Sequence, residues 1–361
     1  MKRRQFLKTA GVGLATAGVA APAIAQAPTI RWRLTTTFPK SLDTLYGACD
    51  MFSKVLADIS DQKFLVQVLG PGEVVPAFQV VDAVSNGTVE MGNTASYYYI
   101  GKDLAFAFGT AVPFGLNTRQ MNAWLTYGDG LELLNELYKN YNMLGIPFGN
   151  TTAQMGGWFR KEIKTVDDLK GLKFRVGGLA GQVLIKLGVV PQQIPPADIY
   201  PALEKGTIDA AEWVGPYDDE KLGFAKIAPY YYYPGWWEGS ANGFLYVNIA
   251  KWNELPKVYQ QMVTTAAGYV AGDLVAKYDV RNAQAIRRLV AAGAQLRPFS
   301  PEILDASLKA TGELFAEISA KNPLFKKIND SMTAFRNEQY QWQQVCEATY
   351  DNYMISRRGR T

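Results

Sequence analysis

Residues 208–216 read Ile208-Asp209-Ala210-Ala211-Glu212-Trp213-Val214-Gly215-Pro216. A short apolar run ends here in a carboxylate beside an indole, and Gly-Pro follows at once, which is the pattern of a strand that stops at a loop. In α/β folds, ligand groups lie at the tips of such strands. We therefore expect Glu212 and Trp213 to lie at a binding site.

A second carboxylate, Glu238, follows an aromatic run and is flanked by Trp236 and Trp237. Two acidic groups among so many aromatic rings would be poorly solvated, and buried carboxylates that lie close together either keep a proton or share a cation. One interpretation is therefore that Glu212 and Glu238 form half of a metal site. The alternative is that they are solvated strand ends that lie far apart.

The chain of 361 residues contains no histidine. This excludes Ser-His and Cys-His nucleophile pairs, histidine general bases and the usual zinc and non-haem iron ligand sets. Any metal ion must be held by oxygen atoms, which selects hard cations such as Na⁺, Ca²⁺ or Mg²⁺. The two cysteines, Cys49 and Cys346, make no disulfide framework, and free thiols are favoured over a bridge between them.

Residues 1–25 have the features of a cleavable export signal, with a basic start, an apolar middle and small residues at the end. The paired Arg3 and Arg4 match the twin-arginine variant, which exports folded proteins to the periplasm. A membrane anchor fits less well, because the apolar run is short and interrupted by glycines and prolines. Four of the 37 basic residues lie in this segment, which leaves 33 basic and 33 acidic residues elsewhere. Such a balance gives no electrostatic footprint for nucleic acid or an anionic membrane.

After this signal, the hydrophobic periodicity predicts alternating strands and helices. The strands are expected at 30–35, 64–69 and 88–91, and the helices at 43–59 and 76–84. This order is typical of a parallel sheet wrapped by helices. The stretch 82–90 is echoed at 201–209, and in both copies a helix ends at Gly and a strand begins after Thr. The echo indicates two lobes and places a second strand tip at 92–99.

The lobes are expected to share the chain discontinuously. The predicted boundaries are a signal at 1–25, a first lobe at 26–148 plus 243–300, a second lobe at 149–242, and C-terminal helices at 301–361. Residues 148–158 would cross between the lobes, so that Asn150 and Gln154 face a ligand or make ordinary loop hydrogen bonds. Residues 242–248 would return to the first lobe, where 295–297 would add an edge strand.

Arg175 lies near the end of a predicted strand and is followed by Gly177-Gly178 and a helix. The segment lacks both the G-x-G-x-x-G order and the G-K-[ST] ending of nucleotide loops. A guanidinium beside the amides of a helix N-terminus suits a carboxylate, which it can bind through two hydrogen bonds. The alternative is an ordinary surface arginine.

The C-terminal part predicts helices at 255–292, at 301–320 and after Pro323. The last of these places apolar residues at alternating spacings of three and four from Phe325 to Tyr353. Such a seam either packs on its own lobe or reaches a second subunit.

In combination, several motifs resemble the extracytoplasmic solute-binding proteins of TRAP transporters. They are the twin-arginine leader, Phe38-Pro39-Lys40-Ser41, Gln154-Met155-Gly156-Gly157-Trp158-Phe159, Lys173-Phe174-Arg175-Val176-Gly177-Gly178, Gly188-Val189-Val190-Pro191, Ala202-Leu203-Glu204-Lys205-Gly206-Thr207-Ile208-Asp209, Glu212-Trp213-Val214-Gly215-Pro216 and Pro234-Gly235-Trp236-Trp237-Glu238. Within that family the chain is similar to the binding proteins for 2-oxo acids such as pyruvate, and next to the lactate binders. The resemblance implies a non-enzymatic periplasmic receptor of the periplasmic-binding-protein-like α/β class, with two lobes, a ligand cleft and long C-terminal helices.

The resemblance also implies roles for particular residues. Arg175 would take the carboxylate of a small monocarboxylate ligand. A cation, Na⁺ in the oxo-acid binders and Ca²⁺ in the lactate binders, would be held by the side chains of Gln154, Glu212 and Glu238 and by the main chain at Trp213. Tyr99 and Asn150 would add ligand hydrogen bonds. The partners would be the membrane subunits of the transporter and a second copy that docks through the C-terminal helix.

Two alternatives stay open at this stage. One is a Ca²⁺-dependent binder of lactate or another 2-hydroxy acid. The other is a carbohydrate-binding protein or a glycosidase that uses Glu212 and Glu238 as its acid and nucleophile. Arg175 argues against the second, since a neutral sugar does not need it.

Overall fold

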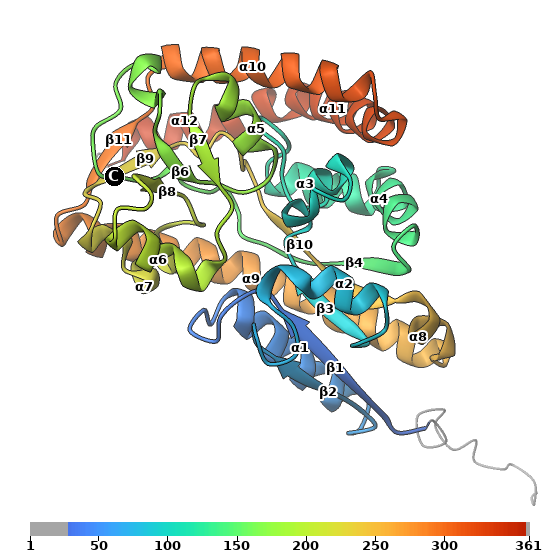
Figure 1. Cartoon of the computed structure of the whole chain (residues 1–361). Helices are drawn as coiled ribbons and strands as arrows, with labels where there is room; N and C mark the ends of the chain where they lie inside the picture. The colour runs from blue at the N-terminus through green and yellow to red at the C-terminus, as the bar shows by residue number, and fades with distance from the viewer. Residues whose placement is uncertain (1–27, 359–361) are drawn as a thin grey trace, which may run out of the picture.

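The computed structural model describes residues 28–358, which form two β-sheets surrounded by helices (Figure 1). The predicted export signal lies outside the described residues. In spatial order, the strands of the first sheet are β2 (Phe64–Leu69), β1 (Ile30–Thr36), β3 (Met91–Thr94), β10 (Asn242–Asn248) and β4 (Met143–Asn150). β1 pairs in parallel with β2 and β3, as predicted, whereas β10 runs antiparallel to β3 and β4.

The second sheet contains shorter strands. In spatial order, they are β11 (Gln295–Pro298), β9 (Tyr230–Tyr233), β5 (Gly157–Phe159), β8 (Ala210–Ala211), β6 (Lys173–Arg175) and β7 (Val190–Gln192). The prediction that 295–297 would extend the first sheet is wrong, because β11 pairs in parallel with β9. The reason is the preceding helix α9 (Lys257–Ala291), whose 35 residues span about 50 Å and carry the chain from one sheet to the other.

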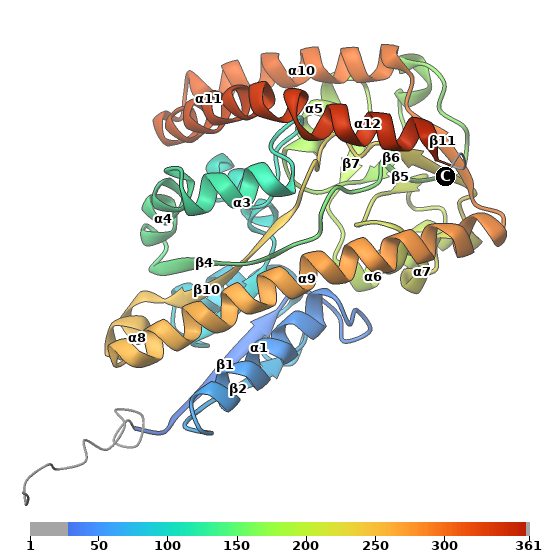
Figure 2. The same ribbon diagram turned by 180° about the vertical axis from the view of Figure 1, so that it is seen from behind.

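The other helices pack around these sheets. They are α1 (Leu45–Ile59), α2 (Val80–Ser85), α3 (Thr118–Thr126), α4 (Gly130–Lys139), α5 (Gly178–Lys186), α6 (Pro196–Glu204), α7 (Pro216–Leu222), α8 (Ile249–Glu254), α10 (Pro301–Ser319), α11 (Pro323–Val345) and α12 (Glu347–Arg357). α9 packs against β4, α1 and α7, and seen from behind it crosses the front of the molecule, with β1 and β2 below it and the second sheet above it (Figure 2). It therefore links the two lobes along its length.

The segment 118–140 forms the two helices α3 and α4. Trp124 is fully buried, and the chain turns tightly around it at Gly128. A Cβ on Gly128 would lie 2.8 Å from the carbonyl oxygen of Trp124, so only glycine fits this turn. α3 begins with a capping box between Asn117 and Gln120.

The last predicted helix is divided at Cys346, whose ψ of −83° is not helical. Phe325, Ile328 and Met332 of α11 are buried, as the apolar seam predicts, but Tyr350 and Tyr353 of α12 are exposed. Only the first turns of the seam therefore pack on the body of the protein. Cys346 is exposed and Cys49 is buried, and both are free thiols.

Besides α9, two segments cross between the sheets. The first, 151–156, joins β4 to β5, and the second, 234–241, joins β9 to β10. They are hydrogen-bonded to each other, since Thr151 N donates to Ala241 O at 3.0 Å and Gln154 N donates to Glu238 O at 3.1 Å. Both crossings therefore lie side by side between the lobes.

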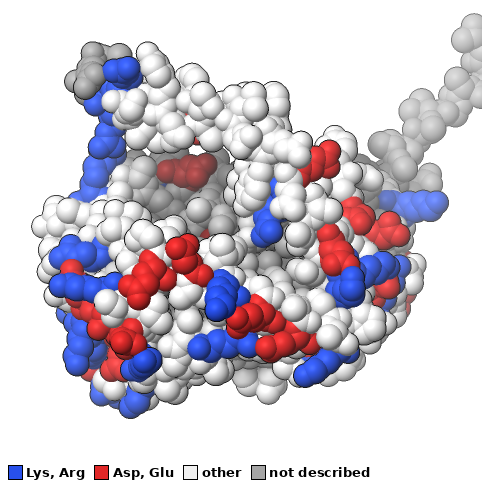
Figure 3. Space-filling view, turned by 90° about the horizontal axis from the view of Figure 1, so that it is seen from above, with Lys and Arg blue, Asp and Glu red and all other residues white. Residues whose placement is uncertain are grey.

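Charges of both signs alternate over the face seen from above (Figure 3). No broad patch of one sign gathers there, in keeping with the balance read from the sequence. In the part of the chain that the structure describes, no helix is both long and apolar enough to cross a membrane.

Candidate functional site

The tip of β8 brings Glu212 beside Arg175. β8 lies between β5 and β6 in the second sheet, and the pairing with β6 continues past its end, where Glu212 N donates to Arg175 O at 3.1 Å. Both side chains are fully buried. The strand that stops at a loop thus places the carboxylate and the guanidinium at one end of the sheet.

Arg175 forms a buried ion pair with Glu212. Its Nη1 donates to Glu212 Oε1 and, at 2.7 Å, to the Glu212 main-chain oxygen, while its Nε donates to Ile194 O at 3.3 Å. Its Nη2 makes a longer contact, 3.4 Å, with the hydroxyl of Tyr98. Nη2 is therefore the nitrogen with capacity for a further acceptor.

The two carboxylate oxygens of Glu212 have different surroundings. Oε1 accepts from Arg175 and from Gly177 N at 3.0 Å, whereas Oε2 is buried without a donor among the described residues. Burial raises the pKa of Glu212 to about 7, although the Arg175 charge and the Gly177 amide act in the opposite direction. One oxygen is thus fixed by the chain and the other is available.

Glu238, on the second crossing segment, is the less satisfied carboxylate. It is 1% exposed, and neither of its oxygens has a donor of good geometry in residues 28–358. Burial raises its pKa well above the usual range, and the nearby Glu212 charge raises it further, while Arg175 partly offsets both effects. The two glutamates are therefore close enough to interact, as the sequence suggested. They are not solvated strand ends.

Gln154 adds an amide oxygen from the first crossing segment. Its Nε2 donates to Thr151 Oγ1 at 2.9 Å, and its Oε1 is buried without a donor from the described chain. The side chains of Tyr97 and Gln154 lie close enough to Glu238 to lower the pKa of that carboxyl, although neither reaches it with good hydrogen-bond geometry. Gln154, Glu212 and Glu238 together present four buried oxygens that accept no hydrogen bond from residues 28–358.

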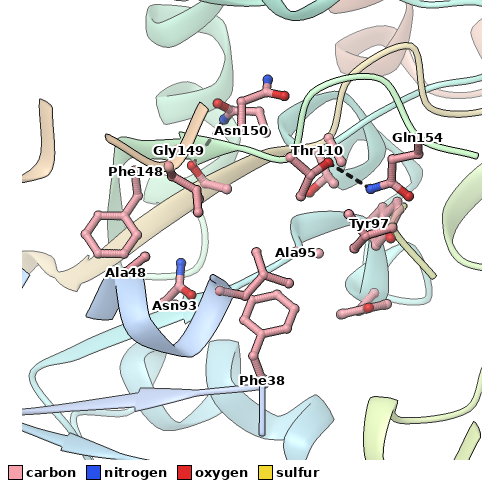
Figure 4. A pocket seen from close by; sticks show the side chains of 18 of the residues that line it. Phe38, Ala48, Asn93, Ala95, Tyr97, Thr110, Phe148, Gly149, Asn150 and Gln154 are labelled. Carbon is pink, nitrogen blue, oxygen red and sulfur yellow. Dashed lines mark hydrogen bonds between the residues drawn. The ribbon is translucent and has the colours of Figure 1, made fainter. Parts of the chain in front are cut away.

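A cavity of about 520 Å³, its opening included, is lined by Gln154 and Trp213, whereas Arg175, Glu212 and Glu238 do not line it. Gln154 and Tyr97 lie at one end of it, and Phe148 and Ala48 lie at the other (Figure 4). Trp213 also lines this cavity and contacts the guanidinium behind it, with Arg175 Cζ 5.2 Å from the indole centroid. The cavity is thus mostly apolar, with polar groups concentrated toward the crossing segments.

Asn150 lines the same cavity from the end of β4. Its Oδ1 accepts from Thr152 N at 2.9 Å, and its Nδ2 is buried without an acceptor within the described residues. The loop hydrogen bond and the ligand-facing position that the sequence offered as alternatives are both compatible with this arrangement. The amide oxygen serves the loop, and the amide nitrogen is left without an acceptor in the described chain.

The structure does not bring Tyr99 to the cavity. Its hydroxyl accepts from Val81 N at 3.3 Å and contacts Thr94, inside the first lobe. The neighbouring Tyr97 and Tyr98 line the cavity instead. The echoed strand tip pointed to this segment, but the direction of each ring depends on the 3₁₀ turn at Ser96–Tyr99, which the sequence pattern does not reveal.

The donor set fits a hard cation. Carboxylate and amide oxygens are the ligands that Na⁺ and Ca²⁺ prefer, and four such oxygens are buried here without a hydrogen-bond donor from the described residues. Residues 28–358 contain no group of three or more His, Cys, Asp or Glu side chains that would hold a metal alone. An ion at this place would therefore need amide or main-chain oxygens as well as Glu212 and Glu238.

Comparison with known proteins places the whole chain in one group. Residues 35–322 match the model of the bacterial extracellular solute-binding proteins, family 7. A monocarboxylate 2-oxoacid-binding periplasmic protein of Nostoc sp. is 47% identical over 363 residues, which is 99% of this chain and 100% of that protein.

Solved structures of TRAP transporter solute-binding proteins are similar throughout. One from Bordetella bronchiseptica, a mixed-occupancy dimer with calcium and picolinate, is 53% identical with a TM-score of 0.91, over 92% of this chain and 99% of that one. One from Pseudoalteromonas atlantica, with sodium and pyruvate, is 39% identical with a TM-score of 0.87, over 90% and 99%. One from Colwellia psychrerythraea, with calcium and pyruvate, is 36% identical with a TM-score of 0.88, over 90% and 99%.

Proposed function

This chain belongs to family 7 of the bacterial extracellular solute-binding proteins, and we propose that it binds a small 2-oxo acid such as pyruvate together with a cation. It is a receptor for transport, not an enzyme. One observation supports the proposal more than any other: four acceptor oxygens of Gln154, Glu212 and Glu238 are buried without a hydrogen-bond partner in the described chain, and Glu238 lies near both of the other side chains. Such a set is costly to bury unless a cation neutralises it.

The chain's own residues divide the task. Glu212, Glu238 and Gln154, with the main chain at Trp213, would hold the cation. Arg175 would bind the ligand carboxylate through Nη2, since Nη1 already serves Glu212. A bound Na⁺ or Ca²⁺ would supply positive charge that attracts the carboxylate and keto oxygens of the ligand.

The relatives support this chemistry. The Nostoc relative is a 2-oxoacid-binding protein, and the solved relatives hold pyruvate or picolinate beside sodium or calcium. We favour Na⁺ with a 2-oxo acid over Ca²⁺ with a 2-hydroxy acid. A glycosidase is disfavoured, because Glu212 is held through Oε1 in a buried ion pair with Arg175, a residue that a neutral sugar does not need.

Cleft closure links binding to transport. The crossing segments and α9 connect the lobes, so a ligand that contacts both lobes shifts the protein toward the closed form. We propose that this closed form docks on the membrane subunits of a TRAP transporter.

Substitution of the arginine tests the carboxylate site. Arg175→Ala should weaken pyruvate binding by roughly 2 to 5 kcal/mol, because a charge-assisted hydrogen bond is lost from a closed cleft. Arg288→Ala is the matched control, since it removes an exposed ion pair with Glu220. Isothermal titration calorimetry in saturating sodium measures both. An affinity for pyruvate that stays within threefold in Arg175→Ala would contradict the assignment.

Removal of the cation tests the metal site. After dialysis against a chelator and sodium-free buffer, pyruvate binding should be lost, and NaCl or CaCl₂ should restore it. Unchanged binding in the dialysed protein would show that no cation takes part. The ion that restores binding at the lower concentration identifies the preferred one.

We propose twin-arginine export on the basis of Arg3 and Arg4. Family membership places the protein outside the cytoplasm, and the paired arginines indicate the route. In the double variant Arg3→Lys, Arg4→Lys, the precursor should accumulate inside the cell, as detected by fractionation. Normal export of that variant would exclude the route.

We also propose a homodimer that forms through α12. Tyr350, Tyr353 and Ile355 are at least 59% exposed on this helix, and the Bordetella relative is a dimer. A stop codon at position 346 should convert a dimer to a monomer in sedimentation velocity. A full-length chain that sediments as a monomer at micromolar concentration would refute the dimer.

A further inference from the structure

Two successive aspartates of α7 are both buried but are bonded to different parts of the molecule. Asp219 accepts from Trp158 Nε1 at 3.0 Å and from the Tyr231 hydroxyl at 2.7 Å. Trp158 belongs to β5 and Tyr231 to β9, both in the second sheet. Asp219 therefore fixes the start of α7 to the second lobe.

Asp218, in contrast, is hydrogen-bonded to the first lobe and to α9. It accepts from the Thr44 hydroxyl at 2.7 and 2.9 Å, one contact to each carboxylate oxygen, and from the Tyr278 hydroxyl at 2.7 Å. Thr44 immediately precedes α1, which packs on the first sheet, and Tyr278 lies on α9. The carboxylate thus joins the second lobe to the first lobe and to the helix that links them.

Thr44 has an unusual hydrogen-bond partner for a residue at the start of a helix. It is the N-cap residue of α1, where a threonine hydroxyl ordinarily accepts from an amide of its own helix. Here the hydroxyl makes no such bond and donates to Asp218 instead. Thr44, Asp218 and Tyr278 are all fully buried. A buried carboxylate without hydrogen-bond donors is costly. Asp218 keeps its donor Thr44 only while the two lobes lie together, so this hydrogen bond favours the arrangement in which they do.

An exposed pair lies beside this buried contact. Asp43 forms an ion pair with Lys221 of α7 and accepts from the Tyr217 hydroxyl at 3.1 Å. Exposed ion pairs contribute little to stability. The buried contact between Thr44 and Asp218 should therefore dominate.

The contact adjoins the ligand cavity without belonging to it. Leu45 and Ala48, on the first turn of α1, line the cavity, whereas Asp218 does not. We propose that Thr44 and Asp218 form an interlobe latch, made when the cleft closes and broken when it opens, which raises ligand affinity without touching the ligand. The affinity of a closing receptor depends on the fraction of molecules that can adopt the closed form, so a latch acts on it directly.

The isosteric variant Thr44→Val tests the latch, because it removes the hydroxyl and keeps the volume. Pyruvate in saturating NaCl is the probe, and stopped-flow fluorescence with calorimetry is the measurement. We expect an affinity about tenfold weaker, which comes from faster dissociation while the association rate stays within twofold. Thr44→Ser, which retains the hydroxyl, should bind within twofold of the wild type.

Tyr231→Phe provides the matched control. It removes a 2.7 Å hydrogen bond from a tyrosine to a buried aspartate, as Tyr278→Phe would, but entirely within the second lobe. Tyr231→Phe should lower the melting temperature and leave the affinity within twofold. Tyr278→Phe should weaken the affinity, because its partner is the latch carboxylate.

Two results would overturn the latch. One is a Thr44→Val affinity within twofold of the wild type. The other is an equal loss of affinity in Tyr231→Phe, which would show a general effect of lower stability. The latch rests on cleft closure and not on the identity of the ligand. If the wild type bound no 2-oxo acid, the proposed function would fail, and hydrogen exchange in the first turn of α1 would still decide the latch. That turn should lose protection in Thr44→Val and keep it in Tyr231→Phe.

Discussion

Three polar side chains at the site, those of Glu212, Gln154 and Asn150, are each hydrogen-bonded at one end and leave the other end without a partner in the described chain. Glu212 uses Oε1 for Arg175 and leaves Oε2, and Gln154 uses Nε2 for Thr151 and leaves Oε1. Asn150 does the reverse, because its oxygen serves the loop and its nitrogen is left. Rotamers fixed in this way hold a site ready for its ligand. The acceptors suit a cation, and the amide donor suits an organic anion.

Neutralising Glu238 should weaken cation binding and spare the ligand-free fold. Glu238→Gln removes a buried charge that has no donor within the described chain. We expect Ca²⁺ affinity at least tenfold weaker, and a free energy of unfolding without the ion that is unchanged or higher by about 1 kcal/mol. Calorimetry with Ca²⁺ and urea unfolding measure these quantities.

The exposed Glu313→Gln is the control for that variant and should change neither quantity. A Glu238→Gln protein that binds Ca²⁺ as tightly as the wild type would place the ion elsewhere. One that unfolds more easily without the ion would show that the carboxylate stabilises the fold by itself.

Residue type revealed the chemistry of the site better than it revealed side-chain direction. The absence of histidine and the two glutamates among aromatic rings already indicated oxygen ligands, and the structure brings Glu212 and Glu238 together. The sequence could not distinguish Tyr97 and Tyr98 from Tyr99. Three successive tyrosines have the same composition, and only the 3₁₀ turn determines which of them face the cavity.

At the scale of elements, local patterns predicted most strands but not all their partners. Strand β2 at Phe64–Leu69 and strand β10 at Asn242–Asn248 appear at their predicted bounds. β11 was expected in the first sheet but pairs with β9 of the second. The two strands are distant in sequence, and the length of α9 determines which sheet the chain reaches. Hydrophobic periodicity indicates which face of a helix or strand is buried, but it does not identify the element that packs against that face.

At the start of α5, Gly178 lies in close contact with Tyr97 of the first lobe. Gly178 has a φ of +62°, and a Cβ there would lie 2.7 Å from Tyr97 Cδ2. Tyr97 comes from the first lobe, so the contact exists when the lobes are together. Glycine at this position therefore permits both the left-handed backbone and the close approach of the ring.

Gly178→Ala should consequently weaken pyruvate binding at least tenfold. Gly206→Ala is the matched control, because Gly206 has a φ of +71° and a Cβ added there would meet no atom within 4 Å. Both variants should lose about 1 kcal/mol of stability from backbone strain. Only Gly178→Ala should lose affinity, as measured by calorimetry, and equal affinities in the two variants would exclude the contact with Tyr97.

At the scale of the whole molecule, the echo between 82–90 and 201–209 was sufficient to predict two lobes. The contacts that join the lobes were not predictable, because Thr44 and Asp218 are 174 residues apart and neither belongs to a motif. A polar pair that is distant in sequence leaves no repeating pattern from which its contact could be predicted. The same holds for the crossing segments, where Gln154 N and Glu238 O meet across distant parts of the chain.

The buried carboxyls make the stability of the ligand-free protein depend on pH. Burial raises the pKa of Asp218 to about 7 and that of Asp219 to about 6. The hydroxyls of Tyr278 and Thr44 and the charge of Lys277 lower the Asp218 pKa, and the charge of Asp219 raises it, but burial outweighs the lowering effects. The folded protein therefore binds more protons than the unfolded chain between about pH 4 and pH 7.

It follows that the free energy of unfolding should fall as the pH rises through this window, by up to about 1.4 kcal/mol per pH unit for each such group. Urea unfolding at pH 5, 6, 7 and 8, without ligand or cation, measures the slope. Asp218→Asn should flatten the curve, since its amide does not titrate, whereas the exposed Asp305→Asn should not. A wild-type stability that rises from pH 5 to pH 7 would mean that Asp218 and Asp219, and with them Glu212 and Glu238, are held ionised in the folded protein. The carboxylate of Asp218 would then be ionised from pH 5 to pH 7, which would mean that the hydrogen bonds from Thr44 and Tyr278 lower its pKa by more than burial raises it.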